Sequence, residues 1–473
     1  MENLPKTTNT NKEGEMKRSK SQVEARVHAI SVIKFDDQRL TSFAGLVVLQ
    51  KLFVRLGLKD RLRRCFGHWR RRCTYGPHLI VMWLLVHLML GYRRLRDVDY
   101  YAGDPLVCRL MGLRRLPNVS TISRQLAEMD PKAVDNLRGE NRRLVLTRVV
   151  EEKLPRVTLD FDGSVQSTRR RAEGTAVGYN KKRKGARSYY PLFCTVSQTG
   201  QFLDLLHRPG NVHDSRGAVE LMRRCFEHTR AVLPKAVFEA RMDSAFFSEK
   251  SLSALHNQGV EFAASVPFQR LPKLKKQIEM CDNWRQVDES WSVAELDFNP
   301  DSWASGFRFI AVRQRVLKQR TGPLQLDLFE PRDHDYEYKV IVTNKVVTAA
   351  LVLAFHNGRG CQEGIIGEAK SCTALDYVPT RRRYANQIFC VAGMMAHNLG
   401  RELQMATQPR RDHNAPNRSA LWCFRTLRTL TRLCIQRAGR LTTPEGRLTL
   451  HMSANARVRE EFTTYMDGLQ NAA

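Results

Sequence analysis

The chain has 473 residues, of which 42% are hydrophobic and 26% are charged, as is ordinary for a folded soluble protein. This composition excludes a collagen, a mucin-like stalk and a wholly disordered chain. The charge balance is unusual, because 77 Lys and Arg stand against 48 Asp and Glu, giving a formal net charge of +29. Such an excess repels itself unless a polyanion neutralises it. We therefore expect a nucleic acid as partner, with an anionic membrane surface as the weaker alternative.

No segment is typical of export or of membrane insertion. The longest apolar run, Leu79–Leu90, is shorter than the roughly 20 residues that span a bilayer, so we expect a buried helix. The N-terminus is polar and lacks the apolar core of a signal peptide. The 11 cysteines are scattered without a CxxC pair, which favours reduced thiols. Together these features predict a cytoplasmic protein, associated with the nucleoid and not with a membrane.

Residues 1–25 lack periodic apolar positions, and we expect a disordered basic tail there. In residues 26–150 the apolar side chains recur three and four positions apart, which predicts a helical DNA-binding region. This region contains a basic group around Trp69. Its members are Arg61, Arg63, Arg64, Arg70, Arg71 and Arg72.

The segment Asn118–Arg124 has the composition of a short capped helix. Ser120 is expected to cap it, and Ser123 and Arg124 would then be presented on its surface. A helix that reads DNA and a plain surface helix are both consistent with these residues.

From residue 151 to residue 270 the pattern changes to that of a mixed α/β sheet. Apolar Val157, Leu159 and Phe161 alternate with polar residues, so we expect a strand with Asp160 and Asp162 on one side. Two further strand-like runs at 190–196 and 201–208 are joined by a turn that contains Gly200, which is typical of a hairpin. A helix, a strand, a helix and a strand then follow at residues 216–230, 236–242, 249–258 and 260–266.

The rest of the chain divides into three predicted parts. Residues 271–345 have strand-like runs at 307–312 and 336–343, and we expect a β-rich insertion subdomain. Helical spacing returns near residue 346, so residues 346–400 are interpreted as the second part of the α/β core. The same spacing predicts a basic helical C-terminal region over residues 401–473.

Three acids are candidates for chemistry on phosphodiesters: Asp162, Asp243 and Glu363. Two of them stand at the ends of predicted strands, where side chains of neighbouring strands converge. Two divalent ions about 3.5–4 Å apart can assist both the attacking and the leaving oxygen of a phosphodiester. Such ions prefer carboxylate ligands. Because most acids in a protein are solvated surface groups, position alone is weak evidence.

The residues around Glu363 strengthen this interpretation. If the segment is helical, Arg359, Glu363 and Lys370 lie within about 40° of arc, so one stripe could hold a metal and contact phosphates. The alternative is an ordinary Arg–Glu surface pair four residues apart. Against it stand glycines that suit a close backbone approach, namely Gly360, Gly364 and Gly367.

This segment resembles the Tyr-Arg-Glu-Lys signature of DDE-type insertion-sequence transposases, the "IS four" superfamily. His356, Arg359, Glu363 and Lys370 keep its spacings, with His356 at the position of the Tyr. Asp160–Ser164 and Met242–Phe247 resemble its two Asp motifs. Further segments are similar to the "IS thirteen-eighty" branch, namely 178–180, 188–192, 385–387 and 396–399. The resemblance covers roughly residues 155–400, with a weaker match at 118–126.

The resemblance implies an RNase H-like fold with a β-strand insertion between the second Asp and the Glu. Asp162, Asp243 and Glu363 would then bind two Mg²⁺ ions, with Mn²⁺ as a substitute. Asp160 is the rival for the first acid. The partners would be double-stranded DNA, both element ends with terminal inverted repeats and target, and a second copy of the chain in the synaptic complex. Arg359 and Lys370 would contact phosphates near the cleaved end, and a contact from His356 would replace that of the Tyr.

Relatives also place an aromatic residue of the insertion on a flipped base, and Trp291 and Trp303 are the candidates here. The alternative is that both belong to the insertion core. The arginine runs 169–171 and 381–383 flank the predicted site, and we expect contacts with the DNA backbone.

The sequence therefore predicts a transposase that cuts and joins DNA. A DNA-binding protein that has lost catalysis and a general RNase H-like nuclease are the alternatives. Only the transposase requires both the acids and a preference for the ends of an element.

Overall fold

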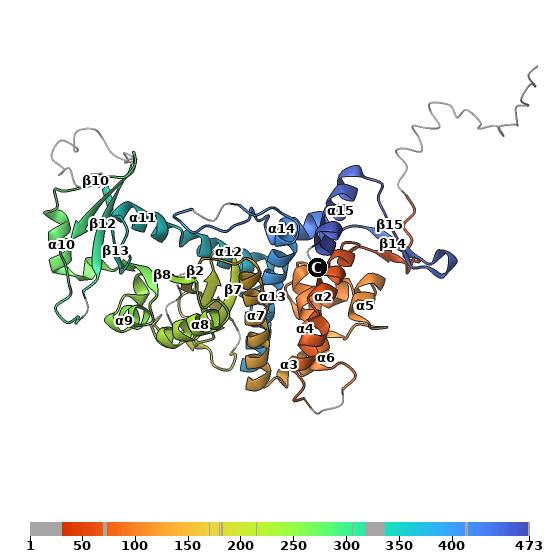
Figure 1. The fold of residues 1–473 in the computed structure, drawn as a ribbon. Coiled ribbons are helices and arrows are strands. Elements are labelled where there is room, and N and C mark those ends of the chain that lie inside the picture. Colours follow the sequence, from red (N-terminus) through yellow and green to blue (C-terminus); the bar gives the residue numbers. More distant parts are fainter. Residues whose placement is uncertain are drawn as a thin grey trace, which may run out of the picture. The chain divides into compact units, whose positions relative to one another are not determined.

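The computed structural model describes residues 31–69, 73–169, 171–178, 180, 183–213, 215–304, 306–316, 336–411 and 415–471 (Figure 1). Contacts divide the chain into residues 1–38 and 39–473. Of the first unit, residues 31–38 are described, and they form neither helix nor strand. The predicted tail 1–25 lies outside the described residues. All elements below belong to the second unit, a mixed α/β structure with a large sheet and many helices.

Helices make up most of the described chain before the sheet, as the apolar spacing predicts. They are α2 (Leu46–Arg55), α3 (Leu58–Cys65), α4 (Pro77–Met89), α5 (Pro105–Met111), α6 (Val119–Ala127) and α7 (Pro131–Glu151). The predicted buried helix is α4, which is apolar on every side. Such a helix must be covered all round, and α3, α6 and the later α13 (Arg383–Met405) pack against it. Arg70–Arg72 of the predicted basic group lie outside the described residues.

The start of α6 differs from the prediction, because Asn118 caps this helix instead of Ser120. The Thr121 backbone amide donates to the Asn118 side-chain oxygen at 2.9 Å. Ser120 Oγ donates to the same oxygen, also at 2.9 Å. Asn, Ser and Asp are similarly good caps, so residue type alone did not decide which of the two would serve.

The first part of the sheet follows the predicted order closely. Its strands are β2 (Arg156–Gly163), β6 (Leu192–Val196), β7 (Gln201–Leu206), β8 (Val237–Met242) and β9 (Glu261–Val266), with α8 (Ala218–Val232) and α9 (Glu249–Asn257) before β8 and β9. β2, β8 and β9 are parallel, and β6 and β7 form the predicted hairpin beside β2. Gly200 has a φ of +61° in the hairpin turn, a left-handed conformation that favours glycine.

Apolar and polar side chains alternate along β2, so its two faces have different surroundings. Val157, Leu159 and Phe161 are fully buried in the hydrophobic core that includes residues of α8 and α9. The other face of β2 carries Asp160 and Asp162. The hydrophobic face therefore fixes the register of β2 and, with it, the side on which both aspartates lie.

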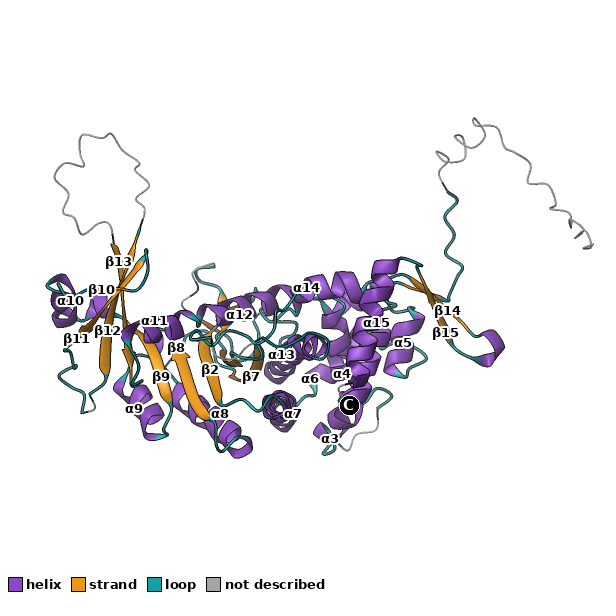
Figure 2. Cartoon of the chain, turned by 45° about the horizontal axis from the view of Figure 1, so that its top comes forward, coloured by secondary structure: helices purple, strands orange, loops and turns teal. Residues whose placement is uncertain are grey.

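The insertion strands extend the same sheet. They are β10 (Arg285–Gln286), β11 (Trp291–Leu296), β12 (Arg308–Arg315) and β13 (Tyr336–Thr343), preceded by α10 (Pro272–Glu279). β13 pairs antiparallel with β9, which gives nine strands in the order β10-β11-β12-β13-β9-β8-β2-β6-β7 (Figure 2). The predicted strands at 307–312 and 336–343 are thus present. The insertion is continuous with the central sheet, which places its side chains on the same surface as those of β9.

After the sheet come α11 (Ala349–Asn357), α12 (Gly360–Cys372) and the long α13, which is buried from Ala385 to Met405. The side chain of Asn398 ties α13 to the edge strand β7. It accepts from the Phe202 amide at 2.8 Å and donates to the Phe202 carbonyl at 2.8 Å. Asn398 thus satisfies the backbone groups of Phe202 at this edge, as a residue of a further strand would.

The C-terminal region is not wholly helical, so this part of the prediction is wrong. It contains α14 (Leu427–Leu430), β14 (Gly439–Thr442), β15 (Thr449–Met452) and α15 (Ala456–Asn471). β14 pairs with β15 and also with β1 (Leu40–Thr41), whose residues precede it by almost the whole chain. Such a long-range pairing leaves no local signal in the sequence. A second three-stranded sheet joins β3 (Gln166–Ser167), β5 (Arg187–Tyr189) and β4 (Ala176–Val177).

All eleven cysteines are free thiols, which is compatible with the predicted absence of a disulfide framework. In the part of the chain that is described, no helix combines the length and the apolar character that crossing a bilayer requires.

Candidate active site

Asp162 and Asp243 lie side by side at the carboxyl ends of two neighbouring strands. β2 and β8 are parallel, and Phe161 pairs with Met242. Asp162 and Asp243 are the next residue on each strand, so the register brings them to the same edge. Asp243 also begins a short 3₁₀ turn, in which its carboxylate accepts from the Ala245 amide at 3.0 Å.

Glu363 comes to this edge from the first turn of α12. Arg359 precedes it by one turn and connects it to the strands. The guanidinium donates to the Glu363 carboxylate at 2.7 Å, and its Nη1 lies 3.7 Å from Oδ2 of Asp162. Arg359 and Asp162 are largely buried, with 18% and 19% of their side chains exposed, whereas 60% of Glu363 is exposed. Glu363 can therefore move toward solvent more easily than Asp162.

The three acids influence one another electrostatically. Burial and, after it, the negative charges of Asp243 and Glu363 raise the pKa of Asp162 from 3.8 to about 7, although Arg359 acts in the opposite direction. Asp162 thus has two negative neighbours and one positive neighbour among these groups, which is a local surplus of negative charge. Such a surplus is what a bound cation would relieve.

Gln362 fixes α12 against β2. Its side chain is fully buried, and its amide donates to the Asp160 carbonyl at 2.8 Å. Because Gln362 directly precedes Glu363, this bond holds the acid of the helix near the acids of the strands. On the opposite side of α12, Glu368 accepts from the Leu427 amide at 2.6 Å and pairs with Arg401 of α13.

Asp160 pairs with Arg241 in the interior. It is fully buried and accepts two hydrogen bonds from Arg241, Nε to Oδ1 at 2.6 Å and Nη2 to Oδ2 at 2.8 Å. Arg241 also donates to the carbonyl oxygens of Phe355 and Asn417 and to Ser197. Both carboxylate oxygens of Asp160 are thus engaged, two residues before Asp162 on the same face.

The glycines of α12 do not serve the close approach that the sequence analysis assigned to them. Gly360, Gly364 and Gly367 are exposed, and a Cβ on any of them would meet nothing within 4 Å. The close approach occurs at Gly358, between α11 and α12. A Cβ there would lie 1.9 Å from the Asn417 carbonyl oxygen.

We therefore expect Gly358→Ala to destabilise the fold by about 1–3 kcal/mol, because the added methyl group would displace Asn417 and Arg241. Gly364→Ala is the matched control, and it should stabilise the protein by about 0.5–1 kcal/mol because alanine favours a helix. Urea unfolding of both variants measures these differences. Equal stability of the two would contradict the packing at Gly358.

His356, expected to contact a phosphate, is buried in this structure, with only 6% of its surface exposed. Its Nε2 lies 3.0 Å from the Ser265 hydroxyl. Burial, and then the charges of Lys339 and Arg359, lower the pKa of His356 to about 3, so the imidazole is neutral near pH 7. A contact with DNA would require this side chain to be uncovered.

The remaining predicted DNA contacts lie at several places. Lys370 is on α12, two turns after Glu363, and is half-buried, while Arg124 is exposed on α6. Trp303 packs in an aromatic cluster, with its ring 4.9 Å from that of Phe247. Trp291 on β11 is half-exposed, and Lys339 Nζ lies 4.6 Å from the centre of its ring.

Lys339 is a candidate that the sequence analysis missed. It lies on β13 and donates to the Asn357 side chain at 2.5 Å, close to the end of α11. Burial and, after it, the nearby charge of Arg359 together lower the pKa of Lys339 to about 8. Only the pairing of β13 with β9 brings it here, and no sequence motif marks it.

Of the two predicted arginine runs, the one at 381–383 contacts Glu173, which follows the other run in the sequence. Arg381–Arg383 are exposed, and Arg382 pairs with Glu173 at 2.7 Å. Arg169 and Arg171 are exposed as well, and Arg170 lies outside the described residues.

Within the described ranges, no group of three or more His, Cys, Asp or Glu side chains is close enough to hold a metal ion as arranged here. Arg359 already occupies a carboxylate oxygen of Glu363. The chemistry of the donors nevertheless suits Mg²⁺, since all three are carboxylates.

A family model described as transposase DDE domain group 1 matches residues 25–473. The chain belongs to this transposase family. Among solved structures, this transposase is similar to a piggyBac transposase synaptic complex with hairpin DNA, studied by cryo-EM. The identity is 12% over 75% of each chain, and the TM-score is 0.37. No curated protein matches the transposase.

Proposed function

We propose that the transposase cuts and joins DNA with Asp162, Asp243 and Glu363 as its catalytic acids. The observation that carries this proposal is the register of β2 and β8, which brings two aspartates to one edge, beside a glutamate from α12. The family supports transposition as the reaction. The three residues themselves are inferred from geometry.

These carboxylates would hold two divalent ions, Mg²⁺ or its substitute Mn²⁺. When bound, such ions activate the attacking oxygen and stabilise the leaving oxygen of a phosphodiester. The negative charges of Asp243 and Glu363 beside Asp162 support a cation here, and the exposure of Glu363 allows this side chain to exchange Arg359 for a metal.

Asp162 is a better first acid than Asp160. Both carboxylate oxygens of Asp160 accept hydrogen bonds from Arg241, and the side chain is inaccessible to solvent. Asp162 faces the edge where Asp243 and Arg359 lie. In this proposal, the pair of Asp160 and Arg241 holds β2 and β8 together next to the two catalytic aspartates.

Cations next to the acids would bind the DNA backbone. Arg359 is placed for a phosphate beside the scissile bond once Glu363 releases it, and Lys370 follows on α12. Lys339 and Trp291 would extend this surface onto the insertion strands. The Trp291 ring is the better candidate for base stacking, because the Trp303 ring already packs against three phenylalanine rings, those of Phe247, Phe307 and Phe309.

The finer assignment follows the sequence motifs. We propose that the chain belongs to the "IS four" group, recognises terminal inverted repeats and works as a homodimer on paired element ends. A Mg²⁺-dependent nicking assay on the DNA that flanks the reading frame tests this assignment. Nicking at the ends of inverted repeats supports it, nicking without preference indicates a general nuclease, and binding without nicking indicates an inactive DNA-binding protein.

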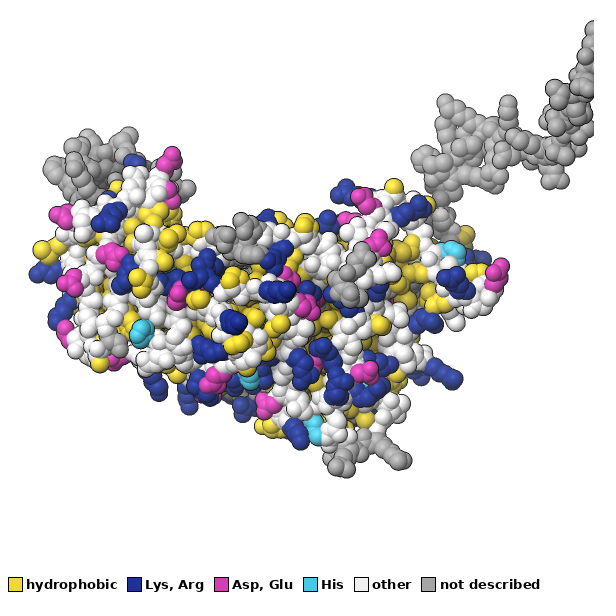
Figure 3. Space-filling model, in the orientation of Figure 1, with side chains coloured by type: hydrophobic (Ala, Val, Ile, Leu, Met, Phe, Trp, Pro, Cys, Tyr) yellow, Lys and Arg dark blue, Asp and Glu magenta, His cyan; other side chains and the backbone are white. Residues whose placement is uncertain are grey.

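Salt dependence tests the role of the positive charge, which is spread widely over the face seen in Figure 3. If six to ten phosphates are neutralised, the affinity for duplex DNA should fall about 10³- to 10⁵-fold between 50 and 200 mM salt. Fluorescence anisotropy across this range gives the slope of log K against log salt. A flat plot would contradict a binding surface built on Lys and Arg.

A further inference from the structure

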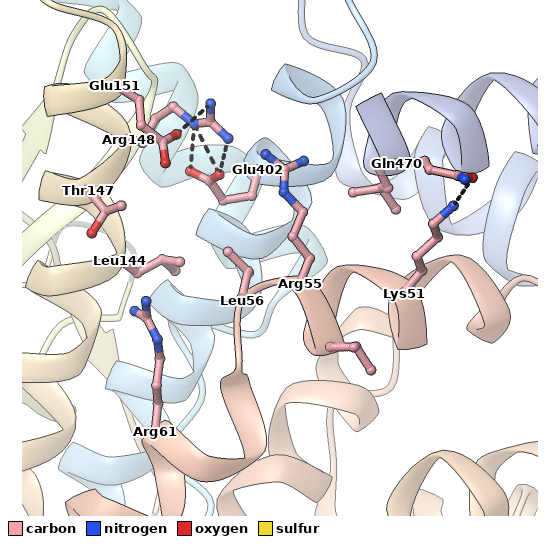
Figure 4. A pocket seen from close by; sticks show the side chains of 12 residues that line it. Lys51, Arg55, Leu56, Arg61, Leu144, Thr147, Arg148, Glu151, Glu402 and Gln470 are labelled. Atoms are coloured by element: carbon pink, nitrogen blue, oxygen red, sulfur yellow. Dashed lines mark hydrogen bonds and ion pairs between the residues drawn. The ribbon is translucent and has the colours of Figure 1, made fainter. Parts of the chain in front are cut away.

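We propose that a cavity between α2, α7, α13 and α15 binds a phosphate group of a ligand. The cavity has a volume of about 530 Å³ (Figure 4). None of its lining residues belongs to the acid site described above. The inference therefore stands apart from the proposed function.

The wall combines apolar and cationic side chains. Val54, Leu56, Leu144 and Leu469 supply apolar surface. The cations are Lys51, Arg55, Arg61 and Arg148, and the acids that line the cavity are Glu151 and Glu402. A pocket with an apolar wall and a few convergent charges is typical of sites for small organic ligands.

Two of the four cations are neutralised by neighbouring acids. Arg148 donates to Glu402 at 2.7 Å and lies 3.0 Å from Glu151. Figure 4 shows these three side chains together in the wall of the cavity. Arg61 lies 3.2 Å from Glu140, outside the cavity. Both acids of the wall are therefore engaged by Arg148.

The other two cations have no acidic partner among the described residues. Arg55 makes no ion pair there, and its Nη1 is buried without a hydrogen-bond acceptor. Lys51 donates only to neutral oxygens, the Met466 carbonyl at 2.6 Å and the Gln470 side chain at 3.2 Å. A buried donor on a charged group is costly when it is unpaired, so the cavity favours an anion.

Phosphate satisfies these groups best, because its oxygens accept charge-assisted hydrogen bonds from a guanidinium in a two-point arrangement. The volume exceeds that of a phosphate ion and falls within the range of pockets for nucleotide-sized ligands. The apolar wall would then contact the body of the ligand. The phosphate could come from a free nucleotide or from the backbone of DNA.

Isothermal titration of the full chain with 2′-deoxyadenosine monophosphate, and separately with inorganic phosphate, tests the inference. We expect one saturable site that Arg55→Met weakens at least about tenfold. Arg109→Met is the matched control, because Arg109 is also in the last turn of a helix, α5, but is exposed. It should bind as the unmodified chain does.

A second variant, Lys51→Met, should also weaken binding, and unchanged melting temperatures would establish that both variants fold. Competition by a short DNA duplex then distinguishes the source: displacement indicates backbone phosphate, and no displacement indicates a free nucleotide. The inference is overturned if no saturable binding occurs, or if Arg55→Met and Arg109→Met bind equally.

Discussion

Asp243→Asn should abolish DNA cleavage and leave DNA binding intact. The substitution keeps the shape of the side chain but removes the charge that would hold a divalent ion beside Asp162. We expect a loss of at least about 10³-fold in the cleavage rate, equivalent to about 4 kcal/mol of transition-state stabilisation. Asp162→Asn and Glu363→Gln should have effects of similar size, because each removes one proposed ligand of the same site.

The fair control for Glu363→Gln is Glu227→Gln. Glu227 pairs with Arg223 four residues earlier on α8, the same spacing as Arg359 and Glu363, and is similarly exposed, at 51%. If Glu363 were only a surface partner of Arg359, both variants would cleave normally. Normal cleavage by any of the three active-site variants would remove that residue from the proposed site.

Arg241→Met should destabilise the protein by about 3–5 kcal/mol, the largest stability effect that we expect. It would leave Asp160 as an unpaired charge in a fully buried position. The carbonyl oxygens of Phe355 and Asn417 would lose a donor at the same time. Thermal and urea unfolding measure the loss.

A double variant separates the ion pair from simple packing. Asp160→Leu combined with Arg241→Met should be more stable than Arg241→Met alone, because no charge is then left buried. Asp301→Asn is the surface control, because it removes an ion pair between exposed side chains, Asp301 at 77% and Lys273 at 75%. It should lower the free energy of unfolding by less than about 1 kcal/mol. If Arg241→Met lowered the stability no more than this surface control does, the result would contradict the role assigned to Arg241.

Much of the central sheet could be predicted from the sequence, because its signals are local. The alternation along β2, the Gly200 turn and the caps of α9 each depend on residues close together in the chain. Ser248 caps α9 as expected, through the Ser251 amide, and Gly259 has a φ of +67° after the helix. The order of these strands and helices along the chain then predicts a mixed α/β sheet.

Features that depend on distant partners could not be predicted. β1 pairs with β14 across the whole unit, so neither strand has a local signal. The role of Gly358 depends on Asn417, and Lys339 reaches the site only through the pairing of β13 with β9. Asp160 and Asp162 are equivalent in the strand pattern. The structure distinguishes them, because Arg241 on β8 pairs with Asp160, whereas Arg359 and Asp243 lie near Asp162.

The most direct test of the account is to locate the metal. Crystals of the full chain with a nicked duplex of element-end DNA can be soaked in Mn²⁺ and measured for anomalous scattering. The account predicts manganese peaks bound by Asp162, Asp243 and Glu363 next to the phosphate at the nick. Ordered DNA with no manganese at these three side chains would contradict it.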